Sequence, residues 1–303
     1  MKRYTLTLSP RPPFDFQLSL RFLSAVPEES LNRVEEGRYF RLFDVGGRAV
    51  LCEVQGMGTV DEPQLELSLV GDGLDGPTVE RAIDALRRVL NLDLDLEEFY
   101  AALCRDPVMA ELCQRYRGYK PILASSLHEA VVWAIIGQQI NQGFAYRLRR
   151  RLVELLGRRM TYRGREYFAF PTPEALASLE LEELTRHQFS RRKVEYIREF
   201  ARAVQAGEVD AVENLQGLRG IGRWTVEFAA MRLGARDALP AADVALRRAV
   251  TRQYGLERRA TEAEVRELGE RWRPWRGLAT FYLWFDLLAA EGPATTHSSC
   301  ADS

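Results

Sequence analysis

Hydrophobic and polar residues alternate in short runs along the first hundred residues, a pattern that favours β-strands. Gly46-Gly47 separates two of these runs and predicts the turn of a β-hairpin. The predicted strands are Tyr4–Leu8, Tyr39–Val45, Arg48–Val54 and Gln64–Val70. A short helix is expected over Gln17–Ala25 and a longer one over Pro77–Leu90, where the proline suits a first helical turn. Residues 1–95 are therefore predicted to form a small antiparallel sheet with two helices.

From Leu96 onward the hydrophobic positions recur every three to four residues, which predicts helices with short breaks and no further strand. Ser126 with Glu129 has the spacing of a capping box at the start of one helix. The segment Met160–Phe170 is basic and aromatic and interrupts the helical pattern. The expected helices are Phe99–Tyr116, Leu127–Ile140, Tyr146–Leu156, Pro173–Leu184 and Arg191–Ala206.

Domain boundaries follow from these elements. We expect one helical lobe over residues 96–118 and 232–292, and a second lobe over residues 119–231 that ends in a helical hairpin. The tail, residues 293–303, is small and polar and is predicted to be disordered.

The stretch from Leu215 to Val250 carries the clearest functional pattern. Gly220–Gly222 separates two helical runs, and the second helix starts directly afterwards at Arg223. Backbone N–H groups at the start of a helix are free, and the helix dipole favours an anion there. Glycines suit such a turn where φ is positive or where a phosphate approaches the main chain. Alone, this pattern is equally consistent with an ordinary turn between helices.

A single carboxylate, Asp243, follows the hairpin after Leu239-Pro240-Ala241-Ala242. It precedes the apolar and basic run Val244–Val250, so an aspartate at this position is a good helix N-cap. By itself this structural role is the simpler interpretation.

The formal net charge of −1 does not by itself indicate a nucleic-acid partner. The distribution does, because residues 1–100 carry 11 Lys/Arg against 18 Asp/Glu, whereas residues 101–303 carry 31 against 25. The part that holds the hairpin is therefore basic, which suits phosphate contacts. Its basic clusters are Arg147–Arg151, Arg191–Lys193, Arg247–Arg252 and Arg271–Arg276.

The cysteines and histidines predict no metal centre. Four cysteines show no CxxC spacing and three histidines are scattered, so free thiols in a reducing compartment are expected rather than disulfides or zinc. No run approaches the roughly 18 apolar residues of a membrane span. The N-terminus lacks the apolar run of a signal peptide. We expect a cytoplasmic protein without membrane contact, and a monomer by default.

The hairpin with its following aspartate resembles the signature of the helix-hairpin-helix DNA glycosylase superfamily. Within it, the chain is most similar to the bacterial DNA-3-methyladenine glycosylase II family, over nearly its whole length. The resemblance implies an α+β fold, with a small N-terminal antiparallel β-sheet and helices followed by a two-lobed all-α helix-hairpin-helix glycosylase core. The segments that carry it are Tyr4–Leu6, Pro12–Asp15, Phe22-Leu23, Ile136–Gln138, Gly220–Thr225, Arg271–Arg276 and Leu283-Trp284.

The resemblance also implies roles for individual residues. Asp243 would be the catalytic carboxylate. The base pocket would be lined by Trp224, Phe228, Trp284 and Phe22. DNA would be contacted by Gly220, Ile221, Gly222, Arg223, Thr225, Gln138 and Gln139. The backbone carbonyls of Gln216, Leu218 and Ile221 would hold a monovalent cation, Na⁺ or K⁺.

The implied reaction is hydrolysis of the N-glycosidic bond of an alkylated purine, of the 3-methyladenine or 7-methylguanine type, flipped out of double-stranded DNA in base excision repair. A cationic base leaves readily, and one carboxylate stabilises the positive charge that grows on the sugar. Trp224 stands where strand-cleaving members have a Schiff-base lysine, so no lyase activity is expected. Only Cys300 follows Asp243, so no iron–sulfur cluster is expected, and no cofactor is required.

Two alternatives stay open. One is a non-catalytic damage-recognition protein that keeps the hairpin, although such a protein has no use for Asp243 facing DNA phosphates. The other is a glycosylase for deaminated or oxidised bases. The electron-rich tryptophans of the pocket favour cationic alkylated bases over such neutral ones. Gln139 also replaces the apolar wedge of the best-known members, and we expect it to fill the vacated stack and to hydrogen-bond the orphaned base.

Overall fold

Five strands at the N-terminus form an antiparallel sheet in the order β1-β5-β4-β3-β2. The computed structural model describes residues 1–21, 23, 26 and 29–291. Gly46 and Gly47 both adopt positive φ, so Val45 pairs with Arg48 across the tight turn that the sequence predicts. The three-residue strand β2 was not predicted, because it is too short to show alternation. The strands are β1 (Lys2–Leu8), β2 (Arg33–Glu35), β3 (Arg38–Val45), β4 (Arg48–Gly58) and β5 (Pro63–Gly71).

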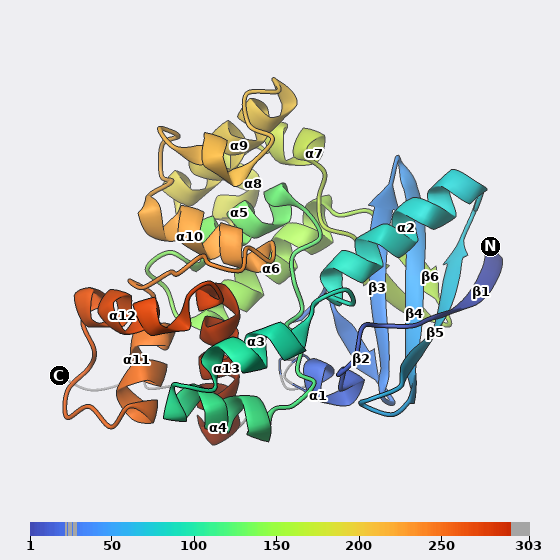
Figure 1. Cartoon of the computed structure of the whole chain (residues 1–303). Helices are drawn as coiled ribbons and strands as arrows, with labels where there is room; N and C mark the ends of the chain where they lie inside the picture. The colour runs from blue at the N-terminus through green and yellow to red at the C-terminus, as the bar shows by residue number, and fades with distance from the viewer. Residues whose placement is uncertain (22, 24–25, 27–28, 292–303) are drawn as a thin grey trace.

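One face of this sheet is covered by α2 (Gly76–Val89), which crosses in front of the strands in Figure 1. Ala82, Leu86 and Val89 of α2 are fully buried against the sheet. The first helix, α1 (Phe16–Leu20), ends earlier than predicted. Its expected end at Ala25 lies outside the described residues.

The opposite face of the sheet is covered by a second hairpin, β6 (Arg159–Tyr162) and β7 (Arg165–Phe168). Its Tyr167 packs on Phe40 of β3 with ring centroids 5.5 Å apart. The prediction of no further strand after Leu96 was therefore wrong. Each arm has only four residues, too few for alternation to stand out from a basic and aromatic segment.

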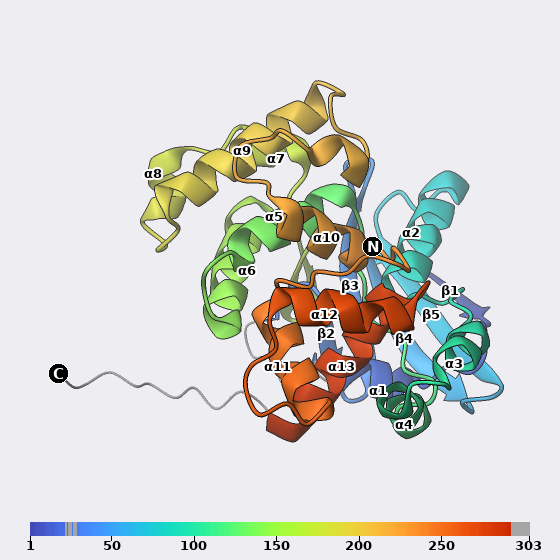
Figure 2. The same cartoon turned by 60° about the vertical axis from the view of Figure 1, so that its left-hand side comes forward.

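The helical part forms two groups around separate hydrophobic cores, with α10 facing the gap between them in Figure 2. No helix among the residues described is long and apolar enough to cross a membrane. The upper group consists of α5 (Leu127–Gly137), α6 (Gln142–Leu156), α7 (Pro173–Ala177), α8 (Leu181–Thr185), α9 (Arg191–Gln205) and α10 (Arg223–Arg232). The lower group consists of α3 (Leu96–Leu103), α4 (Pro107–Arg115), α11 (Val244–Gln253), α12 (Glu262–Gly269) and α13 (Arg276–Glu291).

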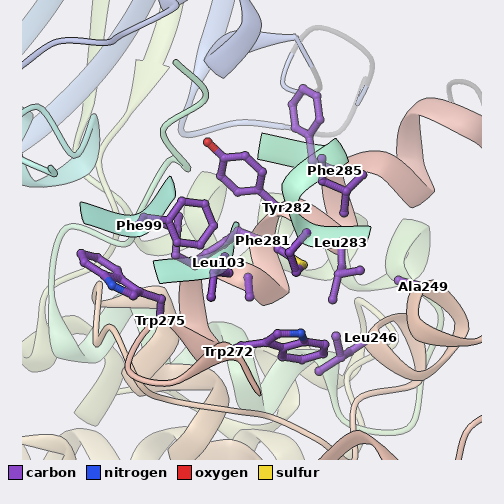
Figure 3. Close-up of a cluster of buried hydrophobic side chains, with 14 of the residues drawn as sticks. Phe99, Leu103, Leu246, Ala249, Trp272, Trp275, Phe281, Tyr282, Leu283 and Phe285 are labelled. Carbon is purple, nitrogen blue, oxygen red and sulfur yellow. The ribbon is translucent and has the colours of Figure 1, made fainter. Parts of the chain in front are cut away.

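Aromatic residues fill the core of the lower group (Figure 3). Trp272 is fully buried, and Trp275 stands edge-on to Phe99 with ring centroids 5.9 Å apart. Two of the three clustered C-terminal tryptophans are therefore core residues, as aromatic residues at helical spacing usually are.

Two predicted helices are broken in the structure. Phe99–Tyr116 divides into α3 and α4, because Asp106 caps α4 and Pro107 occupies its first turn. Proline disfavours a helical conformation in the residue before it. Pro173–Leu184 likewise divides into α7 and α8. The predicted disordered tail, residues 293–303, lies outside the described residues.

A buried ion pair joins the sheet to the upper group of helices. Ser126 caps α5 by accepting a hydrogen bond from the Glu129 N–H, but the Glu129 carboxylate does not return the bond of a capping box. It accepts instead from Arg41 of β3 at 2.6 Å and from Ser125. Since both charged side chains are buried, the two parts hold each other in a fixed orientation.

Candidate active site

The turn before α10 has the geometry of an anion-binding hairpin. Gly217 and Gly220 adopt φ values of +92° and +80°, which residues other than glycine rarely adopt. A Cβ on Gly220 would also lie 2.1 Å from the Tyr196 ring. Gly222 is the N-cap of α10 and makes no side-chain cap, so the first N–H groups of the helix are available to a ligand.

Gln138 and Lys193 hold the loop that follows α5 against the hairpin. The Gln138 side chain donates hydrogen bonds to the Gly220 carbonyl at 2.9 Å and to the Thr225 hydroxyl at 3.1 Å. Lys193 of α9 donates to the carbonyls of Ile136 and Gln138 at 2.6 and 2.8 Å. The side chains of Gln138 and Thr225 thus hydrogen-bond each other within the protein and join the loop to the hairpin.

Gln139 is the exposed tip of this loop. Helix α5 ends at Gly137 rather than at the predicted Ile140, because Gln138 leaves the helical region and Gln139 adopts a φ of +56°. A left-handed residue at this point turns the chain sharply. The structure therefore presents the Gln139 side chain to solvent next to the hairpin.

Asp243 lies at the start of α11 and lines a cavity between the two groups of helices. Its Oδ1 accepts a hydrogen bond from the Leu246 N–H at 2.9 Å, so the expected N-cap role is real. Burial raises the pKa of the Asp243 carboxyl, while the Leu246 N–H and the Trp224 indole act in the opposite direction. The carboxylate is thus partly desolvated, which strengthens its field on a nearby positive charge.

Aromatic rings form the wall of the cavity beside Asp243. The cavity has a volume of about 460 Å³. Trp224 and Phe228, four residues apart on α10, have ring centroids 5.1 Å apart, and Phe228 lies 5.9 Å from Trp284 of α13. Three of the four predicted pocket residues therefore meet at Asp243. The fourth, Phe22, lies outside the described residues.

The inner part of the cavity contains a buried ion pair that the sequence did not suggest. Arg149 of α6 pairs with Glu29, and both side chains are almost fully buried. The Arg149 guanidinium lies 4.3 Å from the Trp133 ring centroid and 4.8 Å from that of Tyr146. The available signal was helical spacing, because Arg149 shares the buried face of α6 with residues such as Ala145 and Leu152.

Several arginines of the basic clusters form ion pairs with acidic side chains of the same chain. Arg150 and Arg151 pair with Glu154, and Arg273 and Arg276 pair with Asp237. Surface ion pairs of this kind contribute little to stability, but they reduce the charge that remains for phosphates.

The described residues hold no group of histidine, cysteine or acidic side chains that suits a metal ion. Cys52, Cys104 and Cys113 are free thiols, and Cys300 lies outside the described residues. The Leu218 carbonyl of the proposed cation site accepts a 3.2 Å bond from the Ile221 N–H. A carbonyl has a second lone pair, so this bond is compatible with cation binding.

An anion-binding helical hairpin, a following carboxylate and an aromatic cavity between two helical lobes together define a helix-hairpin-helix DNA glycosylase. The comparisons with known proteins agree. Residues 132–274 match the family of HhH-GPD superfamily base excision DNA repair proteins, and residues 5–121 match the AlkA N-terminal domain. The chain belongs to this superfamily and, within it, to the DNA-3-methyladenine glycosylases.

Similar proteins cover nearly the whole chain. A DNA-3-methyladenine glycosylase of Bacillus subtilis is 30% identical over 89% of this chain and 93% of its own length. DNA-3-methyladenine glycosylase 2 of Escherichia coli is 28% identical over 92% of this chain and 96% of its own. The solved structure of a 3-methyladenine DNA-glycosylase from Archaeoglobus fulgidus has a TM-score of 0.79 at 28% identity and covers 93% of this chain and 98% of that one.

Proposed function

We propose that this protein is a monofunctional glycosylase that removes alkylated purines, of the 3-methyladenine and 7-methylguanine type, from double-stranded DNA. The observation that carries the proposal is the desolvated Asp243 carboxylate beside an aromatic cavity of about 460 Å³, which is large enough for a purine base. A protein that only recognises damage gains nothing from burying a carboxylate there, since burial of a charge is unfavourable.

The reaction begins when the damaged nucleotide is flipped out of the duplex. N–H groups at the start of α10 bind a backbone phosphate, and Gln139 fills the vacated space in the base stack. Trp224, Phe228 and Trp284 replace the lost stacking, with Phe22 as a further predicted ring.

Bond cleavage then needs one carboxylate. An alkylated purine with a positive charge is a good leaving group, so no residue has to protonate it. Positive charge develops on the sugar as the N-glycosidic bond breaks, and Asp243 stabilises that charge and orients the attacking water. Trp224 occupies the position of a Schiff-base lysine, so the enzyme leaves the DNA strand intact.

Cofactor, cation and assembly complete the proposal. The enzyme works without an iron–sulfur cluster, because a single cysteine follows Asp243 in the sequence. The main-chain carbonyls of Gln216, Leu218 and Ile221 hold one monovalent cation, which favours a bound phosphate at the hairpin. The protein acts as a monomer in the cytoplasm.

The test is base release from methylated duplex DNA by the wild type and by Asp243→Asn. Asparagine is an equally good N-cap, so this variant keeps the bond to Leu246 and removes only the charge. We expect the wild type to release 3-methyladenine or 7-methylguanine and to leave alkali-labile sites in an intact strand. The variant should bind the same DNA and release less than about 1% as much base.

Asp75→Asn is the matched control, because Asp75 also caps a helix but lies in the N-terminal domain, apart from the cavity. It should keep full activity. Equal binding by wild type and Asp243→Asn without base release by either would show that the hairpin only binds DNA. Release of deaminated or oxidised bases alone would change the substrate and keep the catalytic assignment.

A further inference from the structure

One arginine on the cavity wall differs from the other two in its contacts. Arg232, the last residue of α10, makes no side-chain hydrogen bond or ion pair within the described part of the chain, and its Nε is buried. The other cavity arginines differ, since Arg149 pairs with Glu29 and Arg248 pairs with Glu291. A buried guanidinium nitrogen without an acceptor opposes folding, so a ligand that supplies acceptors is the natural reason to keep the half-buried Arg232 at this place.

Arg232 shares one face of α10 with the rings of the proposed base pocket. Trp224, Phe228 and Arg232 follow one another at intervals of four residues. Eight helical residues span about 12 Å, so Arg232 starts two turns deeper than Trp224. Side chains lean toward the N-terminus of their helix, which brings the guanidinium back toward Phe228.

The aromatic neighbours of the Arg232 guanidinium line the same cavity. Arg232 Cζ is 5.7 Å from the centroid of the Phe281 ring, and Phe281 stands edge-on to Trp284 at 5.8 Å. The Trp284 indole lies beside the Asp243 carboxylate and lowers its pKa, so it belongs to the Asp243 end of the cavity. A base whose sugar lay at Asp243 would therefore direct its far edge toward the Arg232 guanidinium, which offers donors only.

Base chemistry decides what such donors select. Guanidinium groups donate and never accept, and the O6 oxygen of guanine is their most common base contact in DNA. A 6-oxopurine such as 7-methylguanine or hypoxanthine presents this oxygen at the far edge, whereas 3-methyladenine presents an amino group that also donates. The positive charge of Arg232 opposes 7-methylguanine and 3-methyladenine alike, because both are cationic, and leaves neutral hypoxanthine unaffected. The exocyclic oxygen is therefore what distinguishes 7-methylguanine from 3-methyladenine at this arginine.

We propose that Arg232 donates hydrogen bonds to the exocyclic oxygen of a flipped 6-oxopurine and is the residue that favours such bases over 3-methyladenine. This inference rests on the proposed glycosylase function and specifies the substrate class of the same cavity.

The experiment compares kcat/KM for duplexes that contain hypoxanthine, 7-methylguanine or 3-methyladenine in one sequence context. Arg232→Met replaces the guanidinium by an apolar chain of similar shape. We expect the ratio of kcat/KM for the 6-oxopurines to that for 3-methyladenine to fall about tenfold or more, the usual discrimination by one base contact. The value for 3-methyladenine should stay constant or rise, because a repulsive charge is removed.

A second variant and a control separate this role from a structural one. Arg232→Lys keeps the charge but loses the planar fork, so it should lower the ratio without a gain for 3-methyladenine. Arg198→Met is the matched control, because Arg198 of α9 also has a buried Nε without a partner but does not line the cavity. It should leave the ratio unchanged.

Equal losses on all three substrates in Arg232→Met, or an unchanged ratio, would overturn the inference while leaving the glycosylase function standing. Failure of the wild type to release any of the three bases would instead overturn the proposed function itself. Thermal unfolding of each variant shows whether it is folded, and the Lys variant decides the question should the Met variant not fold.

Discussion

Asp243 combines two roles that the sequence alone presents as alternatives. As an N-cap it accepts the Leu246 N–H, and as a cavity residue it is held in a partly desolvated position beside Trp224. A capping bond fixes the direction of the side chain, so the structural role positions the carboxylate for the chemical one. Sequence spacing indicated the residue. Its burial depends on rings from α10 and α13, which no local pattern reveals.

The buried charge of Asp243 should lower stability at neutral pH. Burial raises its folded-state pKa, so its contribution stabilises the fold below the unfolded-state pKa and is lost as the pH rises through the folded-state value. Asp243→Asn keeps the cap without the charge. We expect a higher free energy of unfolding at pH 7, by on the order of 1 kcal/mol.

Urea unfolding of both proteins between pH 4 and 8 measures this difference. The advantage of Asp243→Asn should shrink toward the acid end, where the wild-type carboxyl is protonated and uncharged. A variant less stable than the wild type at pH 7 would mean that the carboxylate supports the fold, and that its position is not a compromise made for catalysis.

The loop between α5 and α6 acts as a unit with the hairpin. Lys193 holds two carbonyls of this loop, and Gln138 passes the restraint to the Gly220 carbonyl. Burial lowers the pKa of Lys193 to about 8, in keeping with an ammonium group enclosed by the loop. Gln139 therefore extends from a loop that is held in place, which suits the role in the base stack that we propose for it.

Removal of the Lys193 brace should impair base flipping more than DNA binding. In Lys193→Met the carbonyls of Ile136 and Gln138 lose their donor, and the loop gains freedom that it must lose again on binding. We expect kcat/KM to fall roughly tenfold, since a hydrogen bond to a charged group contributes about 1.5–3 kcal/mol. Fluorescence of a 2-aminopurine beside the lesion reports flipping, and filter binding to undamaged DNA reports affinity.

Arg192→Met is the matched control for this prediction, because it removes a charge from the adjacent, exposed position of α9. This variant should bind undamaged DNA slightly more weakly, and its affinity should depend slightly less on salt concentration. Base flipping should be unchanged. If both variants show the same profile, Lys193 contributes only charge and the brace has no part in flipping.

Sequence patterns predicted those elements whose signal is local. The Gly46-Gly47 hairpin and α9 needed only their own residues, and both were found as expected. The hairpin β6–β7 was missed, since its strands are short and depend on a sheet far away in the sequence. Arg149 was misinterpreted for a similar reason, because its partner Glu29 is 120 positions earlier in the chain.

The molecule as a whole is assembled around its cavity. The N-terminal segment contributes Glu29, the upper group of helices contributes Arg149 and Arg232, and the lower group contributes Trp284. A pocket built from three parts depends on their relative orientation. Buried polar contacts such as Arg41–Glu129 set that orientation more specifically than apolar packing does, since a misaligned pair leaves charges without partners.

Lys120 forms a second set of buried polar contacts between parts of the molecule. Unlike Arg41, it forms no ion pair with a carboxylate of the described residues. Its side chain is fully buried, and Nζ donates to the carbonyls of Arg11 and Leu92 at 2.8 and 3.0 Å. Its backbone N–H donates to the Ser19 hydroxyl. One residue thus ties the N-terminal segment and the end of α2 to the loop that leads into the upper helices.

The charge on Lys120 makes the stability of the whole molecule depend on pH. Burial lowers the pKa of its amino group from 10.5 to about 7, so between these values the unfolded chain binds a proton that the folded chain does not. Stability attributable to Lys120 therefore rises with pH from about 7 toward 10.5 and is constant below about 7. The slope in this window is at most about 1.4 kcal/mol per pH unit.

Lys120→Met isolates this effect, because methionine has a similar length and cannot titrate. Loss of the two hydrogen bonds lowers the free energy of unfolding by an amount that does not depend on pH. The deficit of the variant relative to the wild type should therefore widen as the pH is raised from 7 to 9 in urea unfolding. A deficit that stays constant over this range would mean that Lys120 remains protonated in the folded protein, stabilised by its carbonyls and by the Phe14 ring 5.5 Å away.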